Sequence, residues 1–204
     1  MNEQVSPRFA DNLEARWKDF YRQVLDSLEL PQKRLVCWFD DVSHLDPVCP
    51  ESYRGVFLPI TPKGKGDWPE YVRRDFRQDL FDALIYLPGT TCCADDTILF
   101  EIAFAHELQH FVQWACAPEV WKAGSRRLQG LDPMTEAKAW HIPTERDATS
   151  VSKGVAEALN GPDTVTKYAE AQIKEGLYKS YWEFFQGLSV SGDYDWIKET
   201  ESTT

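Results

Sequence analysis

The chain has 204 residues, of which 43% are hydrophobic and 13% aromatic, so it can bury one hydrophobic core without disulfide support. We expect a single domain over residues 1–204, with flexible ends at 1–5 and 191–204. The formal net charge of −11 disfavours binding to nucleic acid and to anionic membrane surfaces.

The cysteine content and the N-terminal segment point to a cytoplasmic protein. The five cysteines include no CxxC pair and have no regular spacing, which is typical of reduced thiols. The first thirty residues are acidic and lack a basic segment followed by an apolar one, so no signal peptide is expected. No stretch reaches the roughly 20 apolar residues that span a bilayer, and we therefore expect no membrane association.

The first half of the chain is predicted to combine helices with short strands. Apolar residues at three- and four-residue steps follow Ser6 and predict an amphipathic helix that ends near Pro31. The segment 61–69 has the composition of a loop, and the charged segment 70–81 could form another helix. Short apolar segments bounded by turn residues predict strands, at 34–39, 53–60 and 83–87.

The second half is predicted to be helical. Asp95–Thr97 can cap a helix that continues to about Ala117. A loop at 118–133 separates it from a helix over 143–159, which starts with proline and ends at an Asn-Gly pair. A last helix is expected over 164–185.

The predicted helix at 97–117 carries the sequence His-Glu-Leu-Gln-His at 106–110. Four residues of helix turn through about 400°, so His106 and His110 project from one face, where both imidazoles can bind one ion. Glu107 lies beside them, and its carboxylate can accept a proton from a water at the metal. The spacing predicts a Zn²⁺ site with Glu107 as the catalytic base. In the alternative, both histidines lie on a surface helix and bind no metal.

A zinc site with two histidines needs a third protein ligand, and Glu145 is the best candidate. It lies in the first turn of the predicted helix at 143–159, where a rigid element can hold its carboxylate against the metal. Ala148, one turn later, is small enough to let this helix approach the motif helix closely. The competing interpretation is that Glu145 is only a favourable acidic residue at a helix N-terminus.

At these residues the chain resembles the zincin metallopeptidases, and within them the gluzincin pattern of HExxH followed by a glutamate on a second helix. Short intracellular zincin-like proteins of bacteria and phages are similar in kind. The resemblance implies an α+β fold, with a small mixed sheet whose edge strand precedes the motif helix and with further helices packed around that helix. It also implies the site residues: His106, His110 and Glu145 as zinc ligands, and Glu107 as the base.

The sequence departs from this pattern at the acid that would orient a ligand histidine. Gluzincins often have an acidic residue four positions after the ligand glutamate, where this chain has Thr149. Asp147 lies only two positions after Glu145 and, on a helix, on another face. The orienting acid is therefore unassigned.

Four other residues compete with Glu145 for the third ligand position. Cys116 falls where another zincin subclass, with the pattern HExxHxxGxxH, has its third histidine, but Gln113 replaces the glycine of that pattern. Glu119 is too close to the motif to fold back, and Glu136 has no clear helical register with it. His141 could be a ligand, a donor to a transition-state oxyanion or a surface histidine.

These observations predict a cytoplasmic zinc peptidase of narrow specificity that hydrolyses a protein or peptide substrate. If the strand at 83–87 is a sheet edge, the substrate could pair with it as an added strand. One alternative is a binding or effector module with structural zinc, which the presence of Glu107 disfavours. Another is a metal hydrolase of a small amide or ester, which would use the same site.

Overall fold

The computed structural model describes residues 35–39, 55–59, 82–87, 91, 97–129, 139–176 and 178–189. These residues form a mixed, mostly helical α+β structure, as predicted. The elements are β1 (Leu35–Phe39), β2 (Val56–Pro59), β3 (Ala83–Leu87), α4 (Thr97–Cys116), α5 (Pro118–Gln129), α7 (Pro143–Asn160), α8 (Pro162–Glu175) and α9 (Lys179–Gly187).

The strands form a small mixed sheet in the order β1-β3-β2. β1 is parallel to β3, with Leu35 opposite Ala83, and β2 is antiparallel to β3, with Phe57 opposite Ile85. All five residues of β3 are buried, which is typical of a central strand covered on both faces. The expectation that the strand before the motif helix lies at the sheet edge is therefore wrong, because β1 and β2 occupy both sides of β3.

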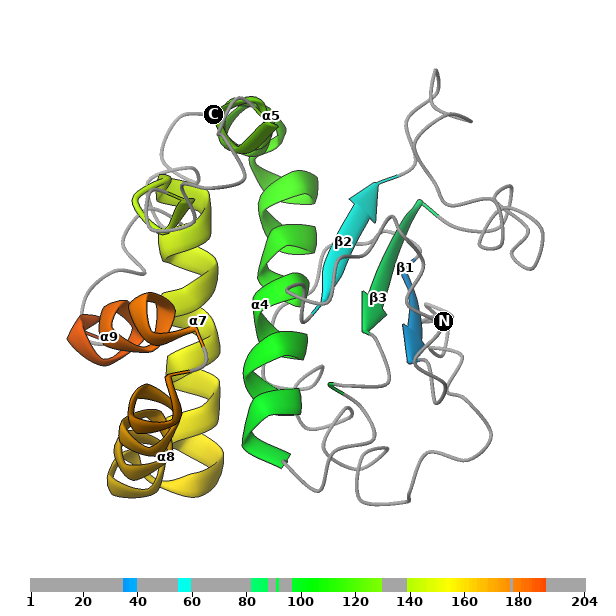
Figure 1. The fold of residues 1–204 in the computed structure, drawn as a ribbon. Helices are drawn as coiled ribbons and strands as arrows, with labels where there is room; N and C mark the ends of the chain where they lie inside the picture. The colour runs from blue at the N-terminus through cyan, green and yellow to red at the C-terminus, as the bar shows by residue number, and fades with distance from the viewer. Residues whose placement is uncertain are drawn as a thin grey trace.

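The motif helix α4 lies between the sheet and the other helices (Figure 1). Its residues Phe100, Phe104, Leu108 and Phe111 recur at helical spacing and belong to one buried cluster with side chains of all three strands. Ile102 belongs to a second cluster, together with residues of α7, α8 and α9. Because both sides of α4 are covered, the helix is apolar along much of its length and holds the motif inside the molecule.

The helix α7 packs closely against α4, and small side chains recur along it. Ala148, Ser152 and Ala156 recur every four residues along α7, and all three are fully buried. Near the C-terminal end of α7, Asn160 donates a hydrogen bond from Nδ2 to the buried Glu101 of α4. The expected close approach of the two helices is therefore confirmed, and it brings the first turn of α7 to the HExxH motif.

The segment after α4 is a helix and not the expected loop. Pro118 occupies the first position of α5, where a missing backbone N–H is tolerated. The Trp121 N–H donates to the Ala117 carbonyl at 3.1 Å and so continues the chain directly into a new helix. Gly124 is accepted within α5 because the helix crosses α7 there: a Cβ on Gly124 would lie 2.1 Å from Oγ1 of Thr144.

The last predicted helix is divided into α8 and α9. Gly176 has a φ of 80°, in the left-handed region, and its N–H donates to the carbonyls of Gln172 and Ile173 at 3.2 Å. This is a common way for a helix to end at glycine. The prediction of one continuous helix over 164–185 is therefore wrong, because Gly176 ends the first helix within it.

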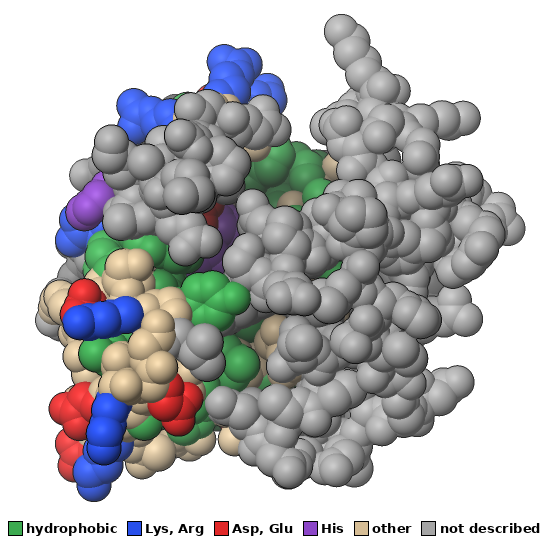
Figure 2. Space-filling view, in the orientation of Figure 1, with side chains coloured by type: hydrophobic (Ala, Val, Ile, Leu, Met, Phe, Trp, Pro, Cys, Tyr) green, Lys and Arg blue, Asp and Glu red, His purple; other side chains and the backbone are tan. Residues whose placement is uncertain are grey.

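The outer surface carries basic side chains on α5. Lys122, Arg126 and Arg127 are exposed there, and basic side chains gather at that end of the molecule in Figure 2. Arg126 and Arg127 lie in the last turn, where a positive charge is favourable to the helix dipole. None of the described helices has the length and apolar character needed to cross a membrane.

Several predictions fall outside the described residues. They are the helix at 6–31, the loop at 61–69, the helix at 70–81, the flexible ends at 1–5 and 191–204, and the candidate ligand Glu136.

Candidate metal site

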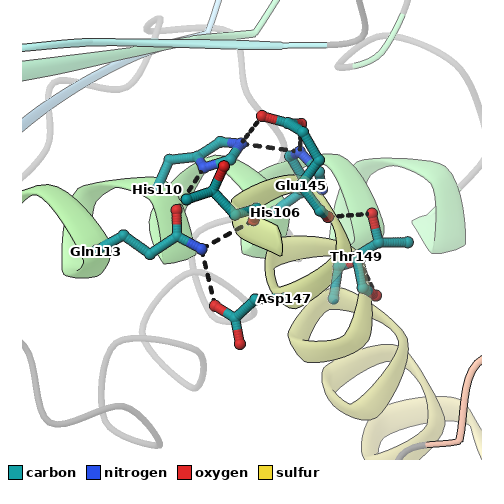
Figure 3. A network of polar contacts seen from close by, with 8 residues as sticks. His106, His110, Gln113, Glu145, Asp147 and Thr149 are labelled. Atoms are coloured by element: carbon teal, nitrogen blue, oxygen red, sulfur yellow. Dashed lines mark hydrogen bonds and ion pairs between the residues drawn. The ribbon is translucent and has the colours of Figure 1, made fainter. Parts of the chain in front are cut away.

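The packing of α7 on α4 brings together His106, His110 and Glu145 (Figure 3). The two histidines come from successive turns of α4, and their Nε2 atoms lie 3.1 Å apart. Glu145, in the first turn of α7, places Oε2 3.4 Å from Nε2 of His106 and Oε1 3.5 Å from Nε2 of His110. Among the described residues, these three form the group whose donor atoms, all within 4.8 Å of one another, could hold a metal ion.

The separations of these donor atoms fit a zinc ion. Atoms bound to zinc at about 2.0–2.1 Å in a tetrahedral arrangement lie about 3.3–3.4 Å from one another. The two Nε2 atoms lie 3.1 Å apart, and each faces a different oxygen of Glu145, at 3.4 Å for His106 and 3.5 Å for His110. Two imidazoles and one carboxylate are also the donor set of many catalytic zinc sites, which keep a further position open. Both the geometry and the chemistry of the group therefore fit the predicted metal.

In the metal-free state, His110 and Glu145 each favour the charged form of the other. Burial lowers the pKa of His110, but the charges of Glu145 and Glu107 and the hydrogen bonds to Glu145 and Gln113 together outweigh burial and raise this pKa to about 9. Burial raises the pKa of Glu145, but the charge of His110 and the contacts with both histidines hold it well below its usual range. Without metal, the site contains an imidazolium next to a carboxylate at neutral pH.

Glu107 is buried beside this group, on the side of the sheet. A Cβ on Gly55 would lie 2.9 Å from Cγ of Glu107, so the start of β2 passes very close to its side chain. Burial raises the pKa of the Glu107 carboxyl, and the charges of His106 and His110 and a hydrogen bond from the Phe57 backbone partly offset this. A buried carboxylate with a raised pKa next to metal-binding groups is suited to general-base catalysis.

Sequence reasoning did not identify Gly55 or Phe57 as part of the site. The available signal was the glycine at the start of a predicted strand, since such a glycine often marks a close approach of backbone to another group. Which group it approaches depends on how β2 packs against α4, and the sequence pattern does not contain that information.

Sequence reasoning also gave no role to Gln113 and left Asp147 unassigned. His110 Nδ1 lies 2.9 Å from Oε1 of Gln113. Gln113 Nε2 donates to the Thr144 carbonyl at 2.9 Å and to Oδ2 of Asp147 at 2.8 Å. Gln109 Nε2 donates to the same Asp147 oxygen at 2.7 Å. Asp147 thus faces α4 and is connected to His110 through one amide (Figure 3).

The position four residues after Glu145 has a different environment. Thr149 is fully buried and donates a hydrogen bond from Oγ1 to the carbonyl of Glu145 at 2.8 Å. This bond lies within α7, a common arrangement for a threonine inside a helix. The hydroxyl of Thr149 is therefore bonded within its own helix.

The other described candidates for a third ligand lie outside the group. Cys116 is the last residue of α4 and is exposed. Glu119 is exposed and forms an ion pair with Lys122 at 2.7 Å. His141 is also exposed, with its ring centroid 6.3 Å from that of Phe184. The fold brings Glu145 to the two histidines, and it leaves these three side chains on the surface.

The chain was compared with models of protein families, with curated proteins and with solved structures, and none of them gives a significant match.

Proposed function

We propose that the protein is a zinc-dependent peptidase with a zincin-like fold. The observation that supports this proposal best is the convergence of three donor groups within 4.8 Å with a buried carboxylate, Glu107, beside them. Structural zinc sites are normally closed by four protein ligands, whereas catalytic sites have three and keep one position open. The described residues supply three donors and a base, which is the catalytic combination.

Each residue has a distinct task in this proposal. His106 and His110 would hold the ion from one helix and Glu145 would hold it from a second, so the packing of α7 on α4 would determine where it binds. A bound zinc ion supplies Lewis-acid polarisation and makes a coordinated water acidic near neutral pH. Glu107 accepts the proton of the attacking water and then donates it to the leaving amine.

The location of β2 favours an extended peptide as the substrate. In the described sheet β2 is an edge strand, and Pro59 is tolerated there because an edge strand does not need every backbone donor. The contact between the Phe57 backbone and Glu107 places this strand beside the site. A peptide that lies along β2 would donate its N–H groups to carbonyls of this edge, because Pro59 has no N–H and the Phe57 N–H is bonded to Glu107, and it would pass next to the base and the metal ligands. We therefore propose that the substrate pairs with β2 and not with the strand at 83–87, which is central in the sheet.

The test of the proposal is Glu107→Gln, which keeps the shape of the side chain but cannot accept a proton. We expect this variant to bind zinc like the wild type and to lose about 10²–10⁴-fold in peptide hydrolysis, the usual size of a general-base contribution. Zinc content is measured by metal analysis, and activity by cleavage of a proteome-derived peptide library. The matched control is Glu101→Gln, a buried glutamate of the same helix that contacts Asn160 of α7 and should keep both properties.

Two results would replace the peptidase proposal. If Glu107→Gln kept full biological activity while His106→Ala lost it, the zinc would be structural and the protein a binding or effector module. If the wild type cleaved small amides or esters but no peptide of the library, the site would belong to a small-molecule hydrolase.

A further inference from the structure

We propose that Gln113 and Asp147 form a hydrogen-bonded relay that positions His110 to bind metal through its Nε2 atom. The relay rests on the proposed zinc site. In this relay the orienting acid that the sequence left unassigned is Asp147. It acts on His110 through the amide of Gln113 and does not contact the histidine directly. The three side chains contact one another in turn: Asp147 of α7 accepts a hydrogen bond from Gln113 of α4, and Gln113 also contacts His110 of the same helix (Figure 3).

The amide of Gln113 can take only one orientation in these surroundings. One end of the amide faces two atoms, the Thr144 carbonyl oxygen and the Asp147 carboxylate oxygen, at 2.9 and 2.8 Å. Both are acceptors without a proton to donate. The end that faces them must therefore be the NH₂ group, which has two donors, and Oε1 must face His110.

The orientation of Gln113 in turn fixes the proton on the imidazole. Because Oε1 of Gln113 can only accept, Nδ1 of His110, 2.9 Å away, must carry the proton of that hydrogen bond. In a neutral imidazole the other nitrogen then has a free lone pair. That nitrogen is Nε2, the atom that faces His106 and Glu145. The relay therefore selects the tautomer that can bind a metal at this position.

Burial makes this selection strict. Gln113 is 1% exposed, so water cannot readily replace the partners of its amide, and turning the amide over would leave buried acceptors facing one another. Gln109, one turn earlier on α4, donates to the same oxygen of Asp147 at 2.7 Å. The carboxylate is thus fixed by two amides of α4, and its negative charge polarises Gln113 and makes His110 a stronger donor to metal.

Two variants separate positioning of His110 from packing of the two helices. Gln113→Leu loses the acceptor opposite Nδ1 of His110 and the bonds donated to Thr144 and Asp147. The double variant Gln113→Glu/Asp147→Asn keeps an acceptor opposite Nδ1, and it replaces the second carboxylate by an amide that can donate to the first. We expect Gln113→Leu to weaken zinc binding about 10–100-fold, the usual cost of losing a partner behind a metal ligand, whereas the double variant stays close to the wild-type affinity.

The matched control is Asn160→Ala, which removes a hydrogen bond between α7 and Glu101 of α4 and touches no member of the relay. It should keep the wild-type zinc affinity. Affinities are measured on the full chain by competition with a chromogenic chelator, and circular dichroism of the metal-free variants checks that each is folded. An equal loss of zinc affinity in Gln113→Leu and in the double variant, or in Gln113→Leu and Asn160→Ala, would show that these bonds only pack the helices and would overturn the relay.

A second measurement needs no variant to fold. Long-range ¹H–¹⁵N spectra of the zinc-loaded wild type report which ring nitrogen of His110 carries a proton, and the relay requires Nδ1. A proton on Nε2 would overturn it. Neither measurement depends on hydrolysis: if the protein binds zinc but cleaves no peptide, the peptidase proposal fails while the relay is still tested. If Gln113→Leu binds zinc normally, the relay fails and the peptidase proposal stands.

Discussion

Glu145 shows how one side chain can satisfy both local and tertiary requirements. Its negative charge lies in the first turn of α7, where the helix dipole favours it. Its two oxygens also reach the two histidines of α4, at 3.4 and 3.5 Å. The helix-terminus interpretation and the ligand interpretation are therefore compatible, and a measurement of metal binding can tell whether the second role exists.

Removal of Glu145 gives a direct test at the residue scale. We expect Glu145→Ala to weaken zinc binding by more than the roughly 10–100-fold cost of losing a supporting hydrogen bond, because a donor atom itself is removed. His106→Ala and His110→Ala should behave in the same way, as measured by metal analysis after dialysis. Cys116→Ser, Glu119→Ala, Glu136→Ala and His141→Ala are the controls and should keep zinc. A requirement for any of these four would move the third ligand away from α7.

At the scale of elements, the site depends on how closely β2 passes α4. The glycine at the start of β2 leaves room for the side chain of Glu107, and the Phe57 backbone contacts its carboxylate. The strand therefore positions the base, while α4 and α7 position the metal ligands. Changes to the strand should therefore lower the rate of catalysis, whereas changes to the two helices should weaken zinc binding.

The substitution Gly55→Ala tests this division. The added Cβ would lie 2.5 Å from Cδ2 of Leu87 and 2.9 Å from Cγ of Glu107, so the strand or the glutamate must move. We expect zinc binding to be kept and kcat to fall by up to about 10²-fold, since a shift of about 1 Å in a catalytic group can have that effect. Gly187→Ala is the control, because nothing lies within 4 Å of its Cβ. Normal turnover by Gly55→Ala, or loss of its zinc, would show that β2 does not position the base.

At the scale of the whole molecule, the site connects two helices that are distant in sequence. α4 belongs both to the cluster against the sheet and to the cluster formed with α7, α8 and α9. A metal ion held by His106 and His110 from α4 and by Glu145 from α7 would therefore link the two packing units. Such a link stabilises the folded state only, because the unfolded chain does not hold the three donors together.

Zinc removal should accordingly lower the stability of the protein. At a free zinc concentration 100 times the dissociation constant, the bound ion adds about 2.7 kcal/mol to the free energy of unfolding. Urea unfolding with zinc and with a chelator measures this difference, and His106→Ala should show none. Identical unfolding curves of the wild type with zinc and with chelator would contradict a site that joins α4 and α7.

The same measurement should depend on pH in a defined direction. In the metal-free fold the pKa of His110 is raised to about 9, so the stability that its charged form contributes is complete below its unfolded pKa, about 6.5, and is lost as pH rises through 9. Zinc must displace this proton, so its binding strengthens over the same range. At constant free zinc, we expect the stability difference between zinc-loaded and metal-free protein to grow from pH 6 to pH 8 by about 1.4 kcal/mol per unit. A constant difference would show that His110 releases no proton.

The features that depend on local periodicity can be read from the amino-acid sequence. The positions of the strands and the bounds of α4 and α7 follow from apolar spacing, turn residues and helix termini, which act between near neighbours. The placement of His106 and His110 on one face is equally local, because any helix through the motif produces it. These parts were predictable without knowledge of the fold.

The features that depend on contacts between distant segments require the folded structure. β3 is central because β1 and β2 pair with both its sides, and strand order is not encoded in the composition of one strand. The approach of Gly55 to Glu107, and the selection of Glu145 over other acids, follow from packing across the core. The connection of Asp147 to His110 needs an amide from one helix to lie between two groups of different elements, and no spacing within either helix specifies that arrangement.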